Sequence, residues 1–100
     1  MIVIKIGLPV EFIWDKRNLD KNWRKHKVNN KECEEIFFDE SKKISKDKFH
    51  SNREKRWILL GKTKKNRLLY LVFTIRNKKI RVISARGTNK KERKLYEKTA

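Results

Sequence analysis

Three apolar-patterned segments stand close together in the second half of the chain, at residues 56–63, 67–76 and 79–86. In the middle segment, alternate residues from Leu69 to Ile75 are apolar and fall on one face, which is the period of two typical of a strand. The connections are three and two residues long, lengths that fit tight hairpins between antiparallel neighbours. The sequence therefore predicts a three-stranded meander, with a turn at Asn77 and Lys78 in which the lysine must adopt a positive φ at some cost.

A helix is expected before the meander. Asp15 is a plausible N-cap, because its carboxylate can accept hydrogen bonds from the free amides of a first turn. Leu19, Trp23 and His26 then recur at helical spacing, with Asn18 and Asn22 beside them, and predict one face of a helix that ends near residue 27.

A second helix is expected over residues 31–38, capped by Asn29 or Asn30, and its apolar stripe places Cys33 in the core. Residues 1–6, 11–14 and 41–47 are possible short strands, and Asn89 can cap a final helix over residues 90–98 with Leu95 as its main apolar contact. This order predicts an α+β fold in which helices pack against one side of an antiparallel sheet of three to five strands.

The excess positive charge lies with the meander and the residues around it. Residues 1–40 hold eight basic and eight acidic side chains, whereas residues 41–100 hold 21 basic and four acidic ones, and the net charge is +17. A charge of this size indicates a polyanionic partner such as RNA, DNA, an acidic protein or an anionic membrane. No stretch approaches the roughly 20 apolar residues of a membrane-spanning helix, so we expect no membrane partner.

Length and cysteine content limit the remaining classes. One hundred residues with 37% hydrophobic content predict a single domain over residues 1–100, in which residues 1–10 form an extension or an edge strand. Cys33 is the only cysteine, and together with His26 and His50 it cannot assemble a structural zinc site, so neither a metal nor a cofactor is expected. The start lacks the small-residue cleavage signature of a signal peptide, which makes the cytoplasm the expected compartment.

Several charged side chains are candidates for contact with phosphates, since they lie at strand ends or on faces that the core does not need: Arg56, Arg67, Arg76, Lys79, Arg81 and Arg86. Glu54 is the only acidic residue between residues 48 and 91, so nearby cations should lower its pKa and keep it ionised. It is either a salt-bridge partner or a general base. His26, at the predicted end of a helix, is either a packing or capping residue or, when protonated, a phosphate ligand.

Seven blocks of sequence between residues 12 and 96 together resemble the BrnT family of ribonuclease toxins from bacterial type II toxin–antitoxin systems. They lie at residues 12–15, 22–26, 36–39, 54–57, 74–76 and 80–86, followed by Glu92, Arg93 and Tyr96. The chain departs from the family at Lys27, where the family usually has glycine, and at Thr88, where it often has alanine. Lys27 gives up the easy left-handed exit from a helix that glycine provides.

The resemblance implies a RelE-like fold and an endoribonuclease that cleaves RNA without a metal and inhibits translation. It also implies neutralisation by a BrnA-type antitoxin with a ribbon-helix-helix domain, and a toxin–antitoxin complex that binds its own operator DNA.

Metal-free cleavage of RNA requires a base for the 2′-OH, stabilisation of charge on the phosphate, and an acid for the leaving 5′-oxygen. As a hypothesis, Glu54 or His26 is the base, and Lys25, His26 or Tyr96 is the acid. Arginine forks suit the phosphate clamp, which we assign to Arg56, Arg76, Arg81 and Arg86. Further RNA contacts are assigned to Lys25, Arg67, Lys79 and Arg93.

Two other functions fit the same charge pattern. One is a non-catalytic module that binds RNA or DNA through the basic sheet, and the other is a docking surface for an acidic antitoxin segment with activity lost. The enzyme and the binding module both predict that affinity for nucleic acid falls steeply as the salt concentration rises. An enzyme alone predicts product with a 2′,3′-cyclic end that persists in chelator.

Overall fold

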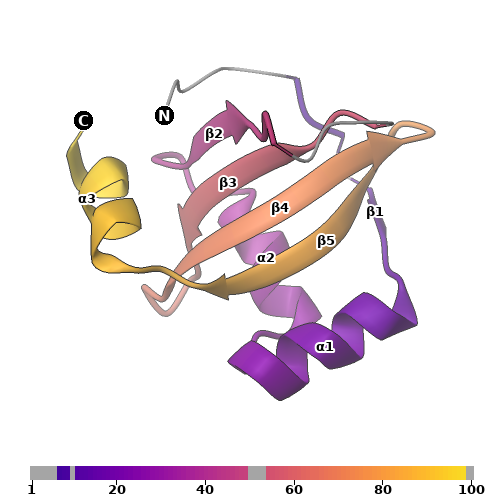
Figure 1. Cartoon of the computed structure of the whole chain (residues 1–100), viewed down its shortest axis with the longest axis horizontal. Coiled ribbons are helices and arrows are strands. Elements are labelled where there is room, and N and C mark those ends of the chain that lie inside the picture. The colour runs from indigo at the N-terminus through magenta and orange to yellow at the C-terminus, as the bar shows by residue number, and fades with distance from the viewer. Residues whose placement is uncertain (1–6, 10, 50–53, 99–100) are drawn as a thin grey trace.

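The computed structural model describes residues 7–9, 11–49 and 54–98. The possible strand at residues 1–6 and His50 lie outside these residues. The described residues form a five-stranded sheet and three helices (Figure 1), and their order is β1 (Phe12–Ile13), α1 (Lys16–His26), α2 (Asn30–Ile36), β2 (Lys43–Lys46), β3 (Trp57–Lys62), β4 (Leu68–Arg76), β5 (Lys79–Gly87) and α3 (Lys90–Lys98).

The sheet has the strand order β1-β5-β4-β3-β2, with β4 in the centre. Antiparallel pairing of β3 with β4 and of β4 with β5 confirms the meander, and β2 adds a further antiparallel strand beside β3. The short strand β1 runs parallel to β5 and pairs only with Ile80 and Arg81. The sheet is therefore mostly antiparallel, as predicted, with one parallel pair at its edge.

Three sharp changes of chain direction in the described residues use residues other than glycine in the left-handed region, one of them at Asn66, with φ 65°, before β4. Asn77 and Lys78 have φ values of 51° and 60°, as the two-residue turn between β4 and β5 requires. Lys27 follows α1 with φ 53° and ψ 42°, and its N–H donates to the carbonyl of Trp23. The backbone thus makes the left-handed helix exit although lysine replaces glycine there.

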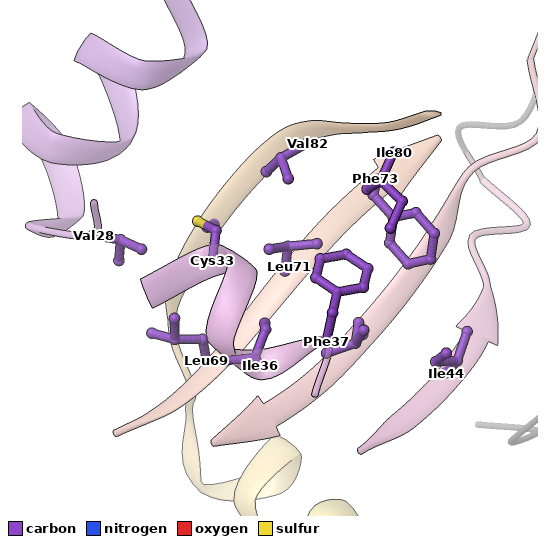
Figure 2. Packing of buried hydrophobic residues seen from close by; sticks show 12 residues of the cluster. Val28, Cys33, Ile36, Phe37, Ile44, Leu69, Leu71, Phe73, Ile80 and Val82 are labelled. Carbon is purple, nitrogen blue, oxygen red and sulfur yellow. The ribbon is translucent and has the colours of Figure 1, made fainter. Parts of the chain in front are cut away.

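The main core lies between one face of the sheet and α2, and Val28 from the connection between α1 and α2 is part of it. Figure 2 shows Ile36 and Phe37 of the α2 segment directed at Leu71 and Phe73 of β4. The ring of Phe37 meets that of Phe73 edge to face, with centroids 5.1 Å apart. Cys33 is buried in this core, as predicted, and burial raises the pKa of its thiol to about 12.

The opposite face of the sheet is covered at one end by α3. Because neighbouring strand residues point to opposite faces, Leu60 and Leu68 lie away from the main core, and they form a second cluster with Tyr96 and Tyr70. Figure 1 shows α3 beside the ends of β3 and β5, away from α2. The expectation that all helices share one side is therefore wrong, and so is the choice of Leu95, which is 37% exposed while Tyr96 is 8% exposed.

The inward face of α1 is polar, which also differs from the prediction. Asn22 is 2% exposed and its Oδ1 accepts the N–H of Ala85, while Asn18 Nδ2 donates to the carbonyl of Val82. These backbone groups belong to the part of β5 that extends beyond its pairing with β1. Asparagine side chains thus satisfy an exposed strand edge, and Trp23 and His26 are left exposed.

Candidate functional site

Cationic side chains gather where the hairpin of β4 and β5 turns. Arg76 forms a two-pronged ion pair with Glu54, with Nη2–Oε1 2.6 Å and Nε–Oε2 3.1 Å. The register pairs Arg76 with Lys79 and Thr74 with Arg81, so the side chains of these four residues share one face of the hairpin. We call Glu54, Arg56, Arg76, Lys79 and Arg81 the hairpin cluster.

A hydrogen bond ties the segment before β3 to this hairpin. The Thr74 hydroxyl donates to the carbonyl of Lys55 at 2.8 Å, and Thr74 itself is 1% exposed. Lys55 stands between Glu54 and Arg56, so a buried anchor on the central strand holds both of these candidates close to the hairpin.

The surrounding arginines keep the carboxylate of Glu54 ionised. The hydrogen bond from Arg76 is the largest cause that lowers the pKa of Glu54, and the charges of Arg76, Arg81 and Arg56 lower it further, against a smaller effect of burial. The sequence expectation of a lowered pKa is confirmed, and Glu54 forms the predicted salt bridge. Its role as a general base stays a prediction.

Two further carboxylates partner the cations of the hairpin cluster. Asp15 caps the first turn of α1 through the N–H of Arg17 and also accepts from Arg81, with Nη2–Oδ2 3.2 Å. Glu11 lies 3.8 Å from Lys79 Nζ. Sequence reasoning identified Asp15 only as a helix cap, because nothing local reveals that residue 81 reaches it.

Arg86 lies at the other end of β5. Its guanidinium forms two 2.8 Å hydrogen bonds with Glu92 of α3 and stacks over the ring of Tyr70, 4.0 Å from the centroid. Burial would raise the pKa of Glu92, but the hydrogen bonds from Arg86 and from the N–H of Asn89 outweigh it, so the pKa is lowered. Glu92 also closes the capping box of its own helix, since its Oε1 accepts the N–H of Asn89 and its N–H donates to Asn89 Oδ1.

Tyr96 makes a different contact. Its hydroxyl donates to Asp39 Oδ2 at 2.6 Å, and Asp39 also accepts from the N–H of Lys62 at 2.8 Å. Burial is the main cause that raises the pKa of Tyr96 to about 12. The phenol proposed as an acid is thus neutral and committed to a neighbouring carboxylate.

A third group surrounds the end of α1. Arg67 donates to the carbonyls of Lys27 and His26 at 2.7 and 2.8 Å and pairs with Glu32 at 3.1 Å. The side chains of Lys25 and His26 are exposed on the last turn of the helix. Arg67, predicted to contact RNA, also holds the strained exit of α1 in place.

The predicted site residues therefore divide into three groups. Arg81 and Arg86 are five residues apart on β5, which at about 3.3 Å per residue is roughly 16 Å. The hairpin cluster contains Glu54 and three of the four arginines of the predicted phosphate clamp, all except Arg86. Arg86 and Tyr96 stand at the α3 end of the sheet, near exposed Arg93, while Lys25, His26 and Arg67 stand at the end of α1.

The model of the ribonuclease toxin family BrnT, of type II toxin–antitoxin systems, matches residues 14–92 of the chain. The chain belongs to the BrnT family. The matched residues include the hairpin cluster, together with Asp15 and Glu92, whereas Arg93 and Tyr96 lie beyond them.

Comparison with solved structures agrees on the fold. The chain resembles the 1.1 Å crystal structure of the Brucella abortus ribonuclease toxin BrnT, with a TM-score of 0.59 at 20% identity over 80% of this chain and 97% of that one. At this identity the likeness shows the fold alone. No curated protein sequence matches significantly.

Two searches of the described residues concern other classes of site. None of the helices in residues 7–9, 11–49 and 54–98 is long and apolar enough to span a membrane. Within the same residues, no three His, Cys, Asp or Glu side chains lie together in a way that could hold a metal ion.

Proposed function

We propose that this BrnT-family chain is a metal-independent endoribonuclease toxin of the cytoplasm that cleaves RNA and thereby inhibits translation. The observation that carries the proposal is the hairpin cluster, in which one ionised carboxylate, Glu54, stands among three arginines. A carboxylate is a base for the 2′-OH, and guanidinium forks match phosphate oxygens. No other described carboxylate has its pKa lowered by three arginines of the predicted clamp.

In the free protein the proposed base, Glu54, is held in an ion pair that binding of the substrate would open. Arg76 binds Glu54 with two hydrogen bonds, and a phosphate oxygen would compete for the same donors. When the phosphate takes Arg76, the carboxylate is released beside the incoming ribose. Arg81 can exchange its partner Asp15 for phosphate in the same way.

The bond changes then follow ordinary transesterification. Glu54 accepts the proton of the 2′-OH, the 2′-oxygen bonds to phosphorus, and the bond from phosphorus to the 5′-oxygen breaks. The leaving oxygen takes a proton, for which the hairpin cluster offers the ammonium of Lys79. The products carry a 2′,3′-cyclic phosphate and a 5′-hydroxyl, and the arginines stabilise the charge that develops on the phosphate.

The family supports the remaining parts of the proposal. Because BrnT proteins are toxins of type II toxin–antitoxin systems, a proteinaceous antitoxin is expected as partner. We propose a BrnA-type ribbon-helix-helix antitoxin, whose complex with the toxin binds operator DNA. The net charge of +17 favours both RNA and an acidic antitoxin segment as ligands.

The test is incubation of the purified chain with naked RNA in excess chelator, followed by analysis of product ends. We expect 2′,3′-cyclic ends from the parent and a kcat about 10²- to 10⁴-fold lower for Glu54→Gln, the range of a lost general base. Lys94→Ala, which removes an exposed cation of α3, should cleave like the parent. A folded Glu54→Gln protein with the parent's rate would remove Glu54 from the mechanism.

Arg86 is a poor residue for this test. Its removal would leave Glu92, whose side chain is 13% exposed, without its cation. A buried charge that loses its partner destabilises the fold, so a loss of cleavage in Arg86→Ala would not report on catalysis alone. If the parent fails to cleave naked RNA, the same assay with translating ribosomes separates a ribosome-dependent enzyme from a binding module.

A further inference from the structure

Trp23 is an exposed aromatic side chain next to a basic groove. Its side chain on α1 is 51% exposed, because the inward positions of that helix belong to asparagine. It lines a groove of about 520 Å³ between the end of α1 and the turn from β3 to β4. We call this groove, with Trp23, Lys27, Lys31, Lys64, Lys65 and Arg67 in its walls, the Trp23 groove.

The charge of the Trp23 groove is available to a ligand. Its two acids are already engaged, since Glu32 pairs with Arg67 and Glu35 accepts the N–H of Lys64 at 3.1 Å. Lys31, Lys64 and Lys65 have exposed side chains, and within the described part of the chain they form no ion pair. The groove therefore presents lysine ammonium groups to solvent.

The left-handed backbone at Lys27 adds a cation next to the indole. Lys27 Nζ lies 5.2 Å from the centroid of the Trp23 ring. An aromatic platform flanked by cations is the arrangement by which proteins hold single-stranded nucleic acid, because every base has a face that stacks and every nucleotide carries a phosphate.

We propose that the Trp23 groove is a second binding site for single-stranded RNA, separate from the hairpin cluster. A base stacks on the exposed indole, and the phosphates on either side contact Lys27, Lys31, Lys64 and Lys65. Arg67, in the Trp23 groove, and Arg76, in the hairpin cluster, are nine residues apart along β4 and the turn before it, which is about 30 Å at strand spacing. The groove therefore holds a part of the RNA that is remote from the scissile bond. The inference rests on the proposed function in taking RNA as the substrate.

A second exposed aromatic offers a matched comparison. Phe38 is 68% exposed and lines a neighbouring groove, whose walls hold four acids, Glu34, Glu35, Asp39 and Glu40, and three lysines, Lys31, Lys62 and Lys64. The Trp23 groove has five cations against two acids, whereas the acids of the Phe38 groove offset its lysines, so RNA should bind at Trp23 in preference to Phe38 although both side chains are accessible. A partner that simply binds exposed apolar side chains would not distinguish Trp23 from Phe38.

The experiment measures the affinity of a fluorescently labelled single-stranded oligoribonucleotide by anisotropy, with Glu54→Gln in every protein to suppress cleavage. Trp23→Leu keeps an apolar side chain but loses the stacking face, and we expect its Kd to rise about 5- to 100-fold. Trp23→Phe should recover most of the affinity. Phe38→Leu should bind like the parent, and circular dichroism verifies that each protein is folded.

Salt dependence tests the lysines independently. Each phosphate contact to a single strand contributes about 0.7 to the slope of log K against log salt concentration. The double variant Lys64→Ala, Lys65→Ala should therefore reduce the slope by about 1.4. Trp23→Leu should weaken binding with the slope unchanged, because stacking releases no counterions.

The outcomes separate this inference from the proposed function. In the cleaving enzyme, Trp23→Leu should raise KM and leave kcat unchanged, as expected for binding that is equal in ground and transition states. Cleavage with the parent's KM, or an affinity equal to that of Phe38→Leu, overturns the groove and leaves the function standing. RNA binding without cleavage, weakened by Trp23→Leu, overturns the function and supports the groove. Loss of antitoxin binding with RNA affinity intact would make the groove a protein-docking face and overturn it.

Discussion

The hydroxyl of Tyr96 should stabilise the fold by an amount that its contacts allow us to estimate. Tyr96→Phe removes the 2.6 Å hydrogen bond to Asp39 and keeps the ring against Leu60 and Leu68, so no cavity forms. Hydrogen bonds to charged groups contribute about 1.5–3 kcal/mol. We expect the free energy of unfolding at neutral pH to fall by that amount, which for about 100 residues lowers Tm by roughly 6–20 °C.

The size of this loss should depend on pH in a definite way. Burial raises the pKa of Asp39, but hydrogen bonds from Tyr96 and from the N–H groups of Lys62 and Ser41 outweigh it, so the pKa lies below its usual 3.8. The stabilisation from the charged acceptor is thus present above that value and is lost as pH falls through the lowered pKa.

At alkaline pH the phenol sets the limit. The pKa of Tyr96 is raised from 10.0 to about 12, so the unfolded chain ionises first. The stabilisation from the neutral phenol is complete below pH 10 and is lost as pH rises toward 12. The difference between parent and variant should therefore be largest between about pH 5 and pH 9.

Urea unfolding from pH 3 to 11 measures this difference directly. Burial also raises the pKa of Cys33 from 9.0 to about 12, but Cys33 is present in both proteins and its contribution cancels. Tyr70→Phe is the matched control, because the Tyr70 hydroxyl makes no hydrogen bond within the described residues. Equal stability of Tyr96→Phe and the parent at pH 7, or a difference that stays constant from pH 9 to 11, would refute the reasoning.

Three further substitutions test local features of the fold by the same urea measurement. Lys78→Gly should raise the free energy of unfolding by about 1 kcal/mol, because Lys78 has φ 60°, a conformation that costs a residue with a Cβ about 1–2 kcal/mol; no gain would mean that the turn is unstrained. Gly61→Ala should lower the free energy of unfolding by about 1–3 kcal/mol, since the new Cβ would lie 2.9 Å from Ile36 Cβ and from the Ile36 carbonyl oxygen. Stability equal to that of the parent would show that α2 can move away. Thr88→Ala should raise the free energy of unfolding by about 1 kcal/mol, because the buried Thr88 hydroxyl has no hydrogen-bond partner among the described residues. A decrease would indicate that the hydroxyl forms a hydrogen bond in solution.

The meander could be predicted because its signals are local. The period of two and the short connections placed β3, β4 and β5 to within one residue at each end. The helix caps Asp15 and Asn89 were recognisable, and Asn29 was one of two candidates for the second helix, because a cap bonds amides two or three residues away. Such features depend on neighbours in the chain and are visible in the sequence.

The faces of the helices could not be predicted in the same way. Asn22 is buried because it satisfies the N–H of Ala85, 63 residues later in the chain. An apolar Trp23 at helical spacing therefore predicted the wrong inward face. Likewise, Tyr96 replaces Leu95 as the contact of α3 because its hydroxyl finds Asp39, 57 residues earlier.

The candidate site shows the same division. The sequence was sufficient to recognise a surplus of cations near the strand ends and one isolated carboxylate, Glu54, because charge counts and strand periods are properties of the chain. It could not tell which cations meet that carboxylate. Packing brings Glu54 to Arg76, 22 residues later, and leaves Arg86 at the far end of β5. Ion pairs of this kind depend on side chains that only the folded sheet brings within a few ångströms, and their chemistry follows from that proximity.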